Sequence, residues 1–148
     1  MKELKRILLV EDDAKDVELT LMALRENSLA NEVVVARDGA EALDYLYRRG
    51  SYALRSEEMP AVVLLDLKMP KVDGIQVLRQ IKSDDRLKQM PVVILTSSKE
   101  SHDLEECYKL GVNAYVVKPV TFSDFVDAVK GLGVFWALIN EPPHLPKP

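Results

Sequence analysis

Five short aliphatic runs, separated by longer segments of helical period, constrain the fold of this chain most strongly. Three of the runs place three or four aliphatic side chains in a row, which is typical of strands buried on both faces of a sheet. The predicted strands are RILLV (6–10), EVVVA (32–36), AVVLL (61–65), PVVIL (91–95) and AYVV (114–117). Strands that alternate with helices predict a parallel sheet with helices on both faces. We therefore expect an α/β fold with a doubly wound, five-stranded (βα)5 architecture.

The segments between these runs repeat apolar residues every three or four positions, as a helix with one buried face does. We predict helices over 14–26 and 40–49, a third beginning near Gly74, a fourth stopped by Gly111 and a fifth starting at Thr121. Asp13 fits the N-cap of the first helix, and Gly50 fits the end of the second. The stretch GSYALRSEEMP (50–60) is a polar insertion before the third strand.

Length and composition fit one domain and limit the classes of partner. The chain has 148 residues, and with 47% hydrophobic and 30% charged residues it can bury a sizeable core. Its net charge of −4 gives no overall attraction to nucleic acid or anionic lipid, so we expect neither as a partner. The apolar run at the start is too short for a signal peptide core, and no stretch approaches the roughly 20 residues of a membrane span. With Cys107 as the only cysteine, these features favour a cytoplasmic protein.

Polar side chains follow four of the five predicted strands directly. The residues at these strand ends are Glu11, Asp12 and Asp13, then Asp66, then Thr96 and Ser97, and finally Lys118 and Pro119. In a doubly wound sheet the binding site lies beyond the carboxyl ends of the strands, so we expect these groups to gather at one edge. Each residue alone also has an ordinary role, such as capping the next helix. Four matched strand ends together favour a functional site.

A magnesium-assisted phosphoryl acceptor is the chemistry that this set of residues predicts. Three neighbouring carboxylates repel one another, and Mg²⁺, which prefers carboxylate, water and phosphate oxygens, suits Glu11, Asp12 and Asp66. Lys118 supplies positive charge toward a phosphoryl group, and Thr96 supplies a hydroxyl donor. A carboxylate can act as the nucleophile and form an aspartyl-phosphate. Asp66, at the end of the central apolar strand with a turn behind it, is the expected nucleophile.

With these motifs in the order ILLVEDD, VVLLDLKMPKVDG, VVILTSS and AYVVKP, the sequence resembles the receiver domains of response regulators in two-component signalling. The resemblance covers about residues 5–130 and implies a flavodoxin-like fold. It implies that Asp66 is the phosphoacceptor, that Glu11 and Asp12 form the acidic pair, and that the backbone carbonyl of Lys68 completes the protein ligands of Mg²⁺. It also implies that Lys118 contacts the phosphoryl group and that a histidine kinase is the phosphodonor.

The same resemblance assigns a conformational switch. Thr96 matches the switch hydroxyl of the family, Tyr115 the switch aromatic, and Pro119 a proline that typically follows a cis peptide. Phosphorylation is then expected to pull on Thr96, while Tyr115 moves inward and changes the face made by the fourth helix, fifth strand and fifth helix. A degenerate receiver that works without phosphate is the alternative, although no motif residue is missing.

Finer features resemble the small stand-alone regulators of phytochrome-type histidine kinases. These features are DGAEALDYLYRRG, the insertion at 50–60 and VFWALINEPP near the end of the chain. We expect a receiver domain over 1–130 and a C-terminal extension over 131–148, with no output domain, so that the signal passes by protein contact. Leu132, Phe135, Trp136 and Ile139 continue the apolar stripe of the last helix, and we favour a homodimer through this segment over folding back onto the same domain.

Two enzyme or cofactor classes compete with this interpretation. A Mg²⁺-dependent phosphohydrolase with an aspartyl nucleophile, like the haloacid dehalogenase family, carries a general acid two residues after the nucleophile, where this chain has Lys68. A flavin-binding module needs a phosphate loop rich in Ser, Thr and Gly after the first strand, where this chain has EDDAKD. Both are therefore disfavoured.

Overall fold

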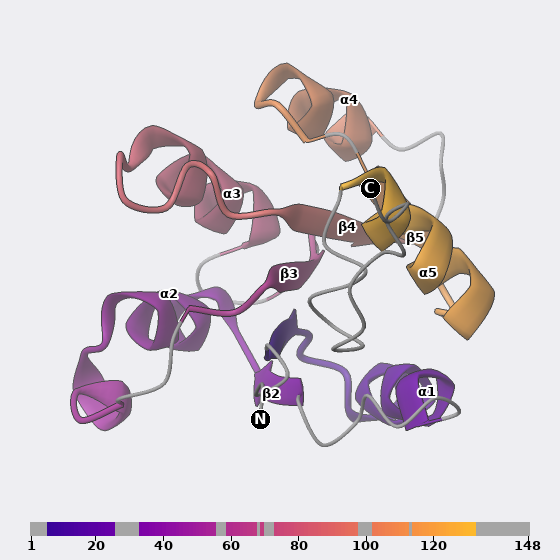
Figure 1. Cartoon of the computed structure of the whole chain (residues 1–148), viewed down its shortest axis with the longest axis horizontal. Coiled ribbons are helices and arrows are strands. Elements are labelled where there is room, and N and C mark those ends of the chain that lie inside the picture. The colour runs from indigo at the N-terminus through magenta and orange to yellow at the C-terminus, as the bar shows by residue number, and fades with distance from the viewer. Residues whose placement is uncertain are drawn as a thin grey trace, which may run out of the picture.

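The protein is a parallel five-stranded sheet with helices on both of its faces (Figure 1). The computed structural model describes residues 6–25, 33–55, 59–67, 69, 73–97, 102–112 and 114–132. The strands are β1 (Ile7–Val10), β2 (Val33–Ala36), β3 (Val62–Asp66), β4 (Val92–Thr96) and β5 (Ala114–Val117). Their order in the sheet is β2-β1-β3-β4-β5, and every neighbouring pair is parallel. The flavodoxin-like fold is confirmed.

Central strands are aliphatic because both of their faces are covered. All residues of β1, β3 and β4 are buried, whereas the edge strands β2 and β5 are partly exposed. An alternating strand would place polar side chains in one of the two cores, so a continuous aliphatic run is required here. Asp66 and Thr96, which end β3 and β4, are buried polar residues in otherwise aliphatic strands and are therefore candidates for a functional role.

Helices divide between the two faces of the sheet. The helices are α1 (Ala14–Arg25), α2 (Gly39–Tyr47), α3 (Gly74–Ser83), α4 (His102–Lys109) and α5 (Phe122–Gly131). Side chains of α1 and α5 pack in one core with Ile7 and Leu64, and those of α2, α3 and α4 pack in the other with Leu8 and Leu65. Figure 1 shows the same division, with α1 and α5 together on one side of the strands. Adjacent residues of one strand thus serve opposite cores.

Local hydrogen bonds explain where several helices begin. Asp38 accepts from the N–H of Glu41 at the start of α2, and Thr121 accepts from the N–H of Asp124 at the start of α5. Asp73 and Gln76 form a reciprocal capping box at the start of α3. Asp13 accepts from the N–H of Asp16, which confirms its predicted role at the start of α1. These caps fix the helix ends that surround the strand termini.

The predicted end of the second helix is wrong by two residues. The helix ends at Tyr47, because Arg48 adopts a left-handed conformation with φ of 53° and its N–H bonds back to the carbonyls of Asp44 and Tyr45. Gly50, with φ of 60°, instead begins a 3₁₀ helix, η2 (Gly50–Tyr52). The insertion therefore starts with ordered structure that its polar composition does not predict.

Two further expectations concern membrane spans and the apolar residues near the end of the chain. Within the described residues, no helix is long and apolar enough to cross a membrane. The expected apolar contacts of Phe135, Trp136 and Ile139 lie outside the described residues, which end at Leu132.

Candidate functional site: an acidic cavity at the strand ends

A cavity of about 320 Å³ opens at the carboxyl ends of β1, β3 and β4. Its walls carry mostly acidic and hydroxyl side chains, with one lysine. The lining residues are Glu11, Asp12, Asp13, Asp16, Asp66, Leu67, Leu95, Thr96, Ser97, Asp103 and Lys118. The structure therefore brings together the polar residues that the sequence places after separate strands, as the topology of a parallel sheet requires.

Glu11 and Asp12 follow β1 and differ sharply in exposure. The N–H of Glu11 donates to the carbonyl of Ala36 at 3.0 Å, which extends the pairing of β1 with β2 by one residue. The Glu11 side chain is fully buried, whereas Asp12 is exposed. One acid of the pair thus lies inside the site and the other at its mouth.

Asp66 is the last residue of β3, and it is 6% exposed. A close crossing of the chain holds this position: the N–H of Gly74, at the start of α3, donates to the carbonyl of Leu67 at 3.0 Å. A Cβ atom at position 74 would lie 2.5 Å from the Leu67 Cα and closer still to the carbonyl oxygen of Asp66. Glycine is therefore required there, because any side chain would push the backbone that carries Asp66.

Lys118 joins the acids of the cavity. Its Nζ lies 2.7 Å from Oε1 of Glu11, 3.1 Å from Oδ2 of Asp66 and 3.2 Å from Oδ2 of Asp16. The Lys118–Pro119 peptide is cis, and the N–H of Lys118 donates to the carbonyl of Thr96 at 2.8 Å. Burial alone would lower the pKa of Lys118, but the hydrogen bond to Glu11 and the charge of Asp66 outweigh it and raise that pKa above its usual value. The ammonium group is therefore firmly protonated and binds both acids.

Lys118 compensates the negative charge of the site only in part. Burial, and next the neighbouring Asp66 carboxyl, raise the pKa of Glu11 to about 7 against the lowering effect of Lys118. One lysine does not fully compensate two buried carboxylates and the nearby Asp12. A further cation near these carboxylates would relieve the repulsion that otherwise favours protonation of Glu11.

A divalent cation fits the carboxylates of the cavity. Glu11, Asp12 and Asp66 each offer one oxygen, and these oxygens all lie within 4.8 Å of one another. Carboxylate oxygens are ligands that Mg²⁺ prefers, together with water and phosphate oxygens, for which the adjoining cavity has room. Lys68, whose backbone carbonyl is the expected third protein ligand, lies outside the described residues.

The two expected switch residues occupy different places. Thr96 ends β4, is 6% exposed and lines the cavity. Tyr115, in β5, is half-buried and does not line it; its ring contacts Tyr108 of α4 edge-on, with centroids 6.4 Å apart. The structure thus brings Thr96 to the acids and leaves Tyr115 on the neighbouring face of α4 and β5.

Sequence reasoning missed two acids of the cavity. Asp16, in the first turn of α1, contacts Lys118, and Asp103, in the first turn of α4, also lines the cavity. An acid in the first turn of a helix is ordinarily assigned to the helix dipole, and this hid both residues. The available signal was that both helices begin at the edge of the sheet where the site lies.

Comparison with known proteins identifies the family. The family model of the response regulator receiver domain matches residues 7–130. The response regulator Rcp1 of Synechocystis sp. is 39% identical over 132 residues, which cover 89% of this chain and 88% of that protein. A similarity found over nearly the whole length of a relative supports a common fold.

Comparison with solved structures supports the same family assignment. The bacteriophytochrome response regulator AtBRR is 63% identical, with a TM-score of 0.86 over 95% of this chain and 100% of that one. The phosphorylated cyanobacterial phytochrome response regulator RcpA is 44% identical, with a TM-score of 0.73 over 90% of this chain and 94% of that one. The Mn²⁺-bound form of Rcp1 is 38% identical, with a TM-score of 0.72 over 97% of this chain and 99% of that one. With its fold, its acidic cavity and these relatives in agreement, the chain belongs to the response regulator receiver domain family.

Proposed function

We propose that this protein accepts a phosphoryl group on Asp66 from a histidine kinase and passes the signal on by protein contact. Receiver domains of response regulators act as phosphoacceptors. The observation that carries the proposal is the position of Lys118, whose Nζ lies within 3.1 Å of both the Glu11 and the Asp66 carboxylates. A buried carboxylate beside a fixed cation, at the edge of an open cavity, is arranged to receive an anionic group.

The transfer needs little besides positioning and charge compensation. An electron pair on an Asp66 carboxylate oxygen forms the new P–O bond, and the P–N bond of the phosphohistidine breaks toward the imidazole nitrogen, which takes up a proton. Lys118 is placed to bind a phosphoryl oxygen, and Thr96 lines the same cavity with a hydroxyl donor. All three residues come from strand ends.

Mg²⁺ is the proposed cofactor, held by Glu11, Asp12, Asp66 and the backbone carbonyl of Lys68. The cluster of carboxylate oxygens within 4.8 Å supports this assignment, as does the Mn²⁺-bound structure of the relative Rcp1. When bound, the cation neutralises charge on the acids and on the phosphoryl oxygens.

Thr96 and Tyr115 form the proposed switch. Thr96 lies in the cavity, and Tyr115 lies in the strand beside it, in the register Thr96 with Val117 and Ile94 with Tyr115. A new dianion on Asp66 attracts the Thr96 hydroxyl, and Tyr115 then moves toward the space that this leaves. A local charge thus biases a two-state element on the face of α4, β5 and α5.

Acetyl phosphate with MgCl₂, followed by mass spectrometry, tests the acceptor. The wild-type protein should gain one phosphoryl group mapped to Asp66, and Asp66→Asn should gain none. Asp13→Asn is the matched control, because Asp13 lines the cavity but lies outside the cluster of potential metal ligands, so it should still be labelled. Persistent labelling of the Asp66 variant would refute the assignment.

A phytochrome-type histidine kinase is the proposed phosphodonor, because AtBRR and RcpA, which are 63% and 44% identical, are phytochrome response regulators. A purified bacteriophytochrome kinase, autophosphorylated with ATP, should transfer its label to this protein faster than a kinase of another sensor class. Equal rates from both would argue against the assignment.

We also propose a receiver domain over 1–130 and a C-terminal extension over 131–148 that forms a homodimer with the last helix. The apolar residues Leu132, Phe135, Trp136 and Ile139 support this interpretation. Sedimentation of the full chain and of a version ending at Lys130 tests it, and a dimer that survives truncation would exclude the extension as the main contact.

The phosphohydrolase alternative lacks a general acid. Two residues after Asp66 the chain has Lys68 in place of the carboxylic acid that serves as general acid in such enzymes. Turnover of a panel of phosphomonoesters would restore this alternative.

A further inference from the structure

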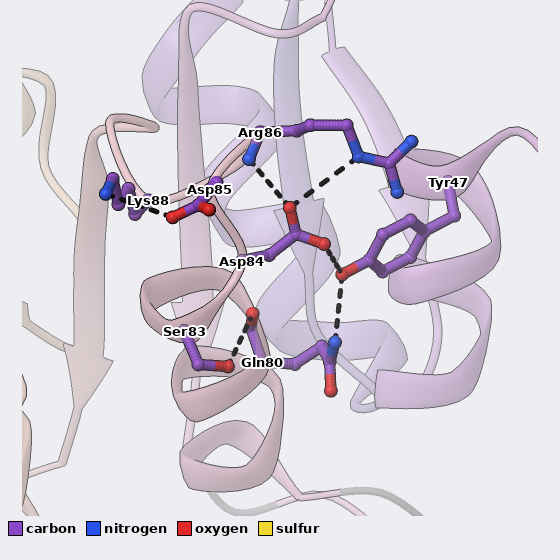
Figure 2. Close-up of polar contacts among 7 residues, drawn as sticks. All are labelled: Tyr47, Gln80, Ser83, Asp84, Asp85, Arg86 and Lys88. Atoms are coloured by element: carbon purple, nitrogen blue, oxygen red, sulfur yellow. Dashed lines mark hydrogen bonds and ion pairs between the residues drawn. The ribbon is translucent and has the colours of Figure 1, made fainter.

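Tyr47, the last residue of α2, ties this helix to the end of α3 (Figure 2). Its hydroxyl donates to Oδ2 of Asp84 at 2.5 Å and accepts from Nε2 of Gln80 at 2.9 Å. Asp84 is the C-cap of α3, so the ring is fixed between two elements. This contact lies outside the acidic cavity, and the proposed function does not use it.

Two arginines pack on this one ring. The Cζ atoms of Arg49 and Arg86 lie 5.0 and 5.5 Å from the centroid of Tyr47. Each guanidinium also engages a carboxylate through Nε: Arg49 with Asp44 at 2.8 Å, and Arg86 with Asp84 at 3.7 Å. Both side chains are nonetheless mostly exposed, at 57% and 78%. We call Tyr47, Arg49 and Arg86 the arginine–tyrosine surface.

The free edges of the two guanidinium groups are the chemically significant feature. In the described part of the chain, the terminal nitrogens of Arg49 and Arg86 have no hydrogen-bond partner, because their carboxylates bind at Nε. Arg79 differs: its terminal nitrogen is already bound to Glu106 at 2.6 Å, and it stacks on no ring in the described residues. Arg49 is held by a hydrogen bond at Nε and by the ring, and Arg86 by the ring and an ion pair at 3.7 Å, so each can turn its two terminal nitrogens toward a partner.

The location separates this surface from the phosphoryl site. Helices that follow parallel strands begin at the carboxyl edge of the sheet and run back to its amino edge. The ends of α2 and α3 therefore lie at the amino edge, and no residue of the surface lines the acidic cavity at the other edge. A partner bound here leaves Asp66 accessible.

The chemistry of the surface identifies the class of partner. A guanidinium fork matches a carboxylate in two parallel hydrogen bonds, and arginine and tyrosine are enriched in protein interfaces. Contact with the Tyr47 ring restricts both side chains, which lowers the entropy lost on binding. A nucleic-acid backbone would need a longer stripe of unpaired cations, whereas the nearby Lys88 is already paired with Asp85 at 3.1 Å. We propose that the arginine–tyrosine surface docks an acidic protein segment carrying at least two neighbouring carboxylates.

Titration with a hexaglutamate peptide, followed by NMR of the arginine Nε–H signals, tests this proposal. The signals of Arg49 and Arg86 should shift and saturate together, while that of Arg79 should not. The double variant Arg49→Gln, Arg86→Gln should bind the peptide about tenfold more weakly, since two charge-assisted contacts are lost. Arg79→Gln, which removes the same charge from another exposed arginine, should bind like the wild type.

Further variants separate docking from a purely structural role. Tyr47→Phe keeps the ring under both arginines and removes the hydroxyl contacts, so it should lower the melting temperature while binding persists. The pair Arg49→Lys, Arg86→Lys keeps the charge and loses the forks, so binding should weaken even where the Gln pair fails to fold. An equal loss in Arg79→Gln, undiminished binding by the Lys pair, or tighter binding of a single-stranded oligonucleotide at the same ionic strength would overturn the proposal.

Discussion

Replacing Gly74 by alanine tests how the fold holds the proposed phosphoacceptor. Gly74 opens α3 directly where this helix crosses the end of β3. A methyl group there would lie 2.5 Å from the Leu67 Cα and closer to the Asp66 carbonyl oxygen, and both atoms belong to backbone that cannot rotate away. The crossing must open, and Asp66 must move with it.

The size of the effect follows from the overlap. Carbon atoms pack at roughly 3.5–4 Å, so the backbone must shift by about 1 Å. Overpacking of this kind costs about 1–3 kcal/mol, against which alanine regains up to about 1 kcal/mol of helix propensity. We expect a net loss of about 1–2 kcal/mol in the free energy of unfolding, which lowers the melting temperature by about 3–8 °C in a chain of this size.

Urea denaturation and labelling by acetyl phosphate measure the two consequences. Gly74→Ala should unfold at lower urea and should be phosphorylated more slowly, because Asp66 is displaced from Lys118. Gly131→Ala is the matched control: an alanine at this position, the last residue of α5, meets nothing within 4 Å, so stability should stay equal or rise slightly. Unchanged stability and labelling in Gly74→Ala would refute the argument that this crossing positions Asp66.

Three other predictions follow from single contacts. Mg²⁺ at ten times its Kd should stabilise the wild type by about 1.4 kcal/mol, measured as a rise in melting temperature, and Asp12→Asn should reduce that rise. Asp73→Ala should cost about 1 kcal/mol in urea denaturation, since it removes the capping box with Gln76, while Asp73→Asn should cost less. Burial raises the pKa of Cys107 to about 11, so its protonated thiol stabilises the fold below the usual pKa near 9, and this contribution should be lost as the pH rises from 9 to 11. Cys107→Ala should flatten that part of the stability–pH profile, and an unchanged slope would contradict the assignment.

The sheet was predictable because its signal is local and repeated. Each buried strand must be aliphatic throughout, and each helix must show an apolar stripe, so the alternation of the two patterns specifies a parallel sheet. All five predicted strands are confirmed to within a residue at either end. The strand order also matches a doubly wound sheet, and it then fixes which strand ends meet.

The end of α2 was not predictable from its residues alone. Glycine is the usual left-handed residue after a helix, and Gly50 therefore seemed the natural stop. Arg48 takes that conformation instead, at a steric cost of about 1–2 kcal/mol. Contacts distant in sequence accompany it: Tyr52 donates to Glu41, and the Arg55 guanidinium lies 4.1 Å from the centre of the Tyr45 ring. Such tertiary contacts leave no periodic trace in the sequence.

The acidic site was largely predictable for a related reason. Glu11, Asp12, Asp66, Thr96 and Lys118 all lie at or just after the carboxyl ends of strands, so the topology alone brings them to one edge. Residues that reach the site from helices were missed, since which face of a helix points at a cavity depends on packing. The arginine–tyrosine surface was hidden for the same reason, because it joins the ends of two helices.

The contacts of Lys118 suggest how the proposed charge sensor and switch are coupled. Its side chain binds Glu11 and Asp66, and its backbone N–H binds the carbonyl of Thr96 across β4 and β5. A phosphoryl group on Asp66 replaces one carboxylate charge with a larger one, so the ammonium group must redistribute its contacts. Because the backbone of Lys118 bonds to Thr96, which carries the proposed switch hydroxyl, we expect that redistribution to be felt at Thr96. Lys118 thus links the proposed phosphoacceptor to Thr96, and Lys118→Arg, which keeps the charge but not the geometry, should retain Mg²⁺ binding while weakening the response of Tyr115.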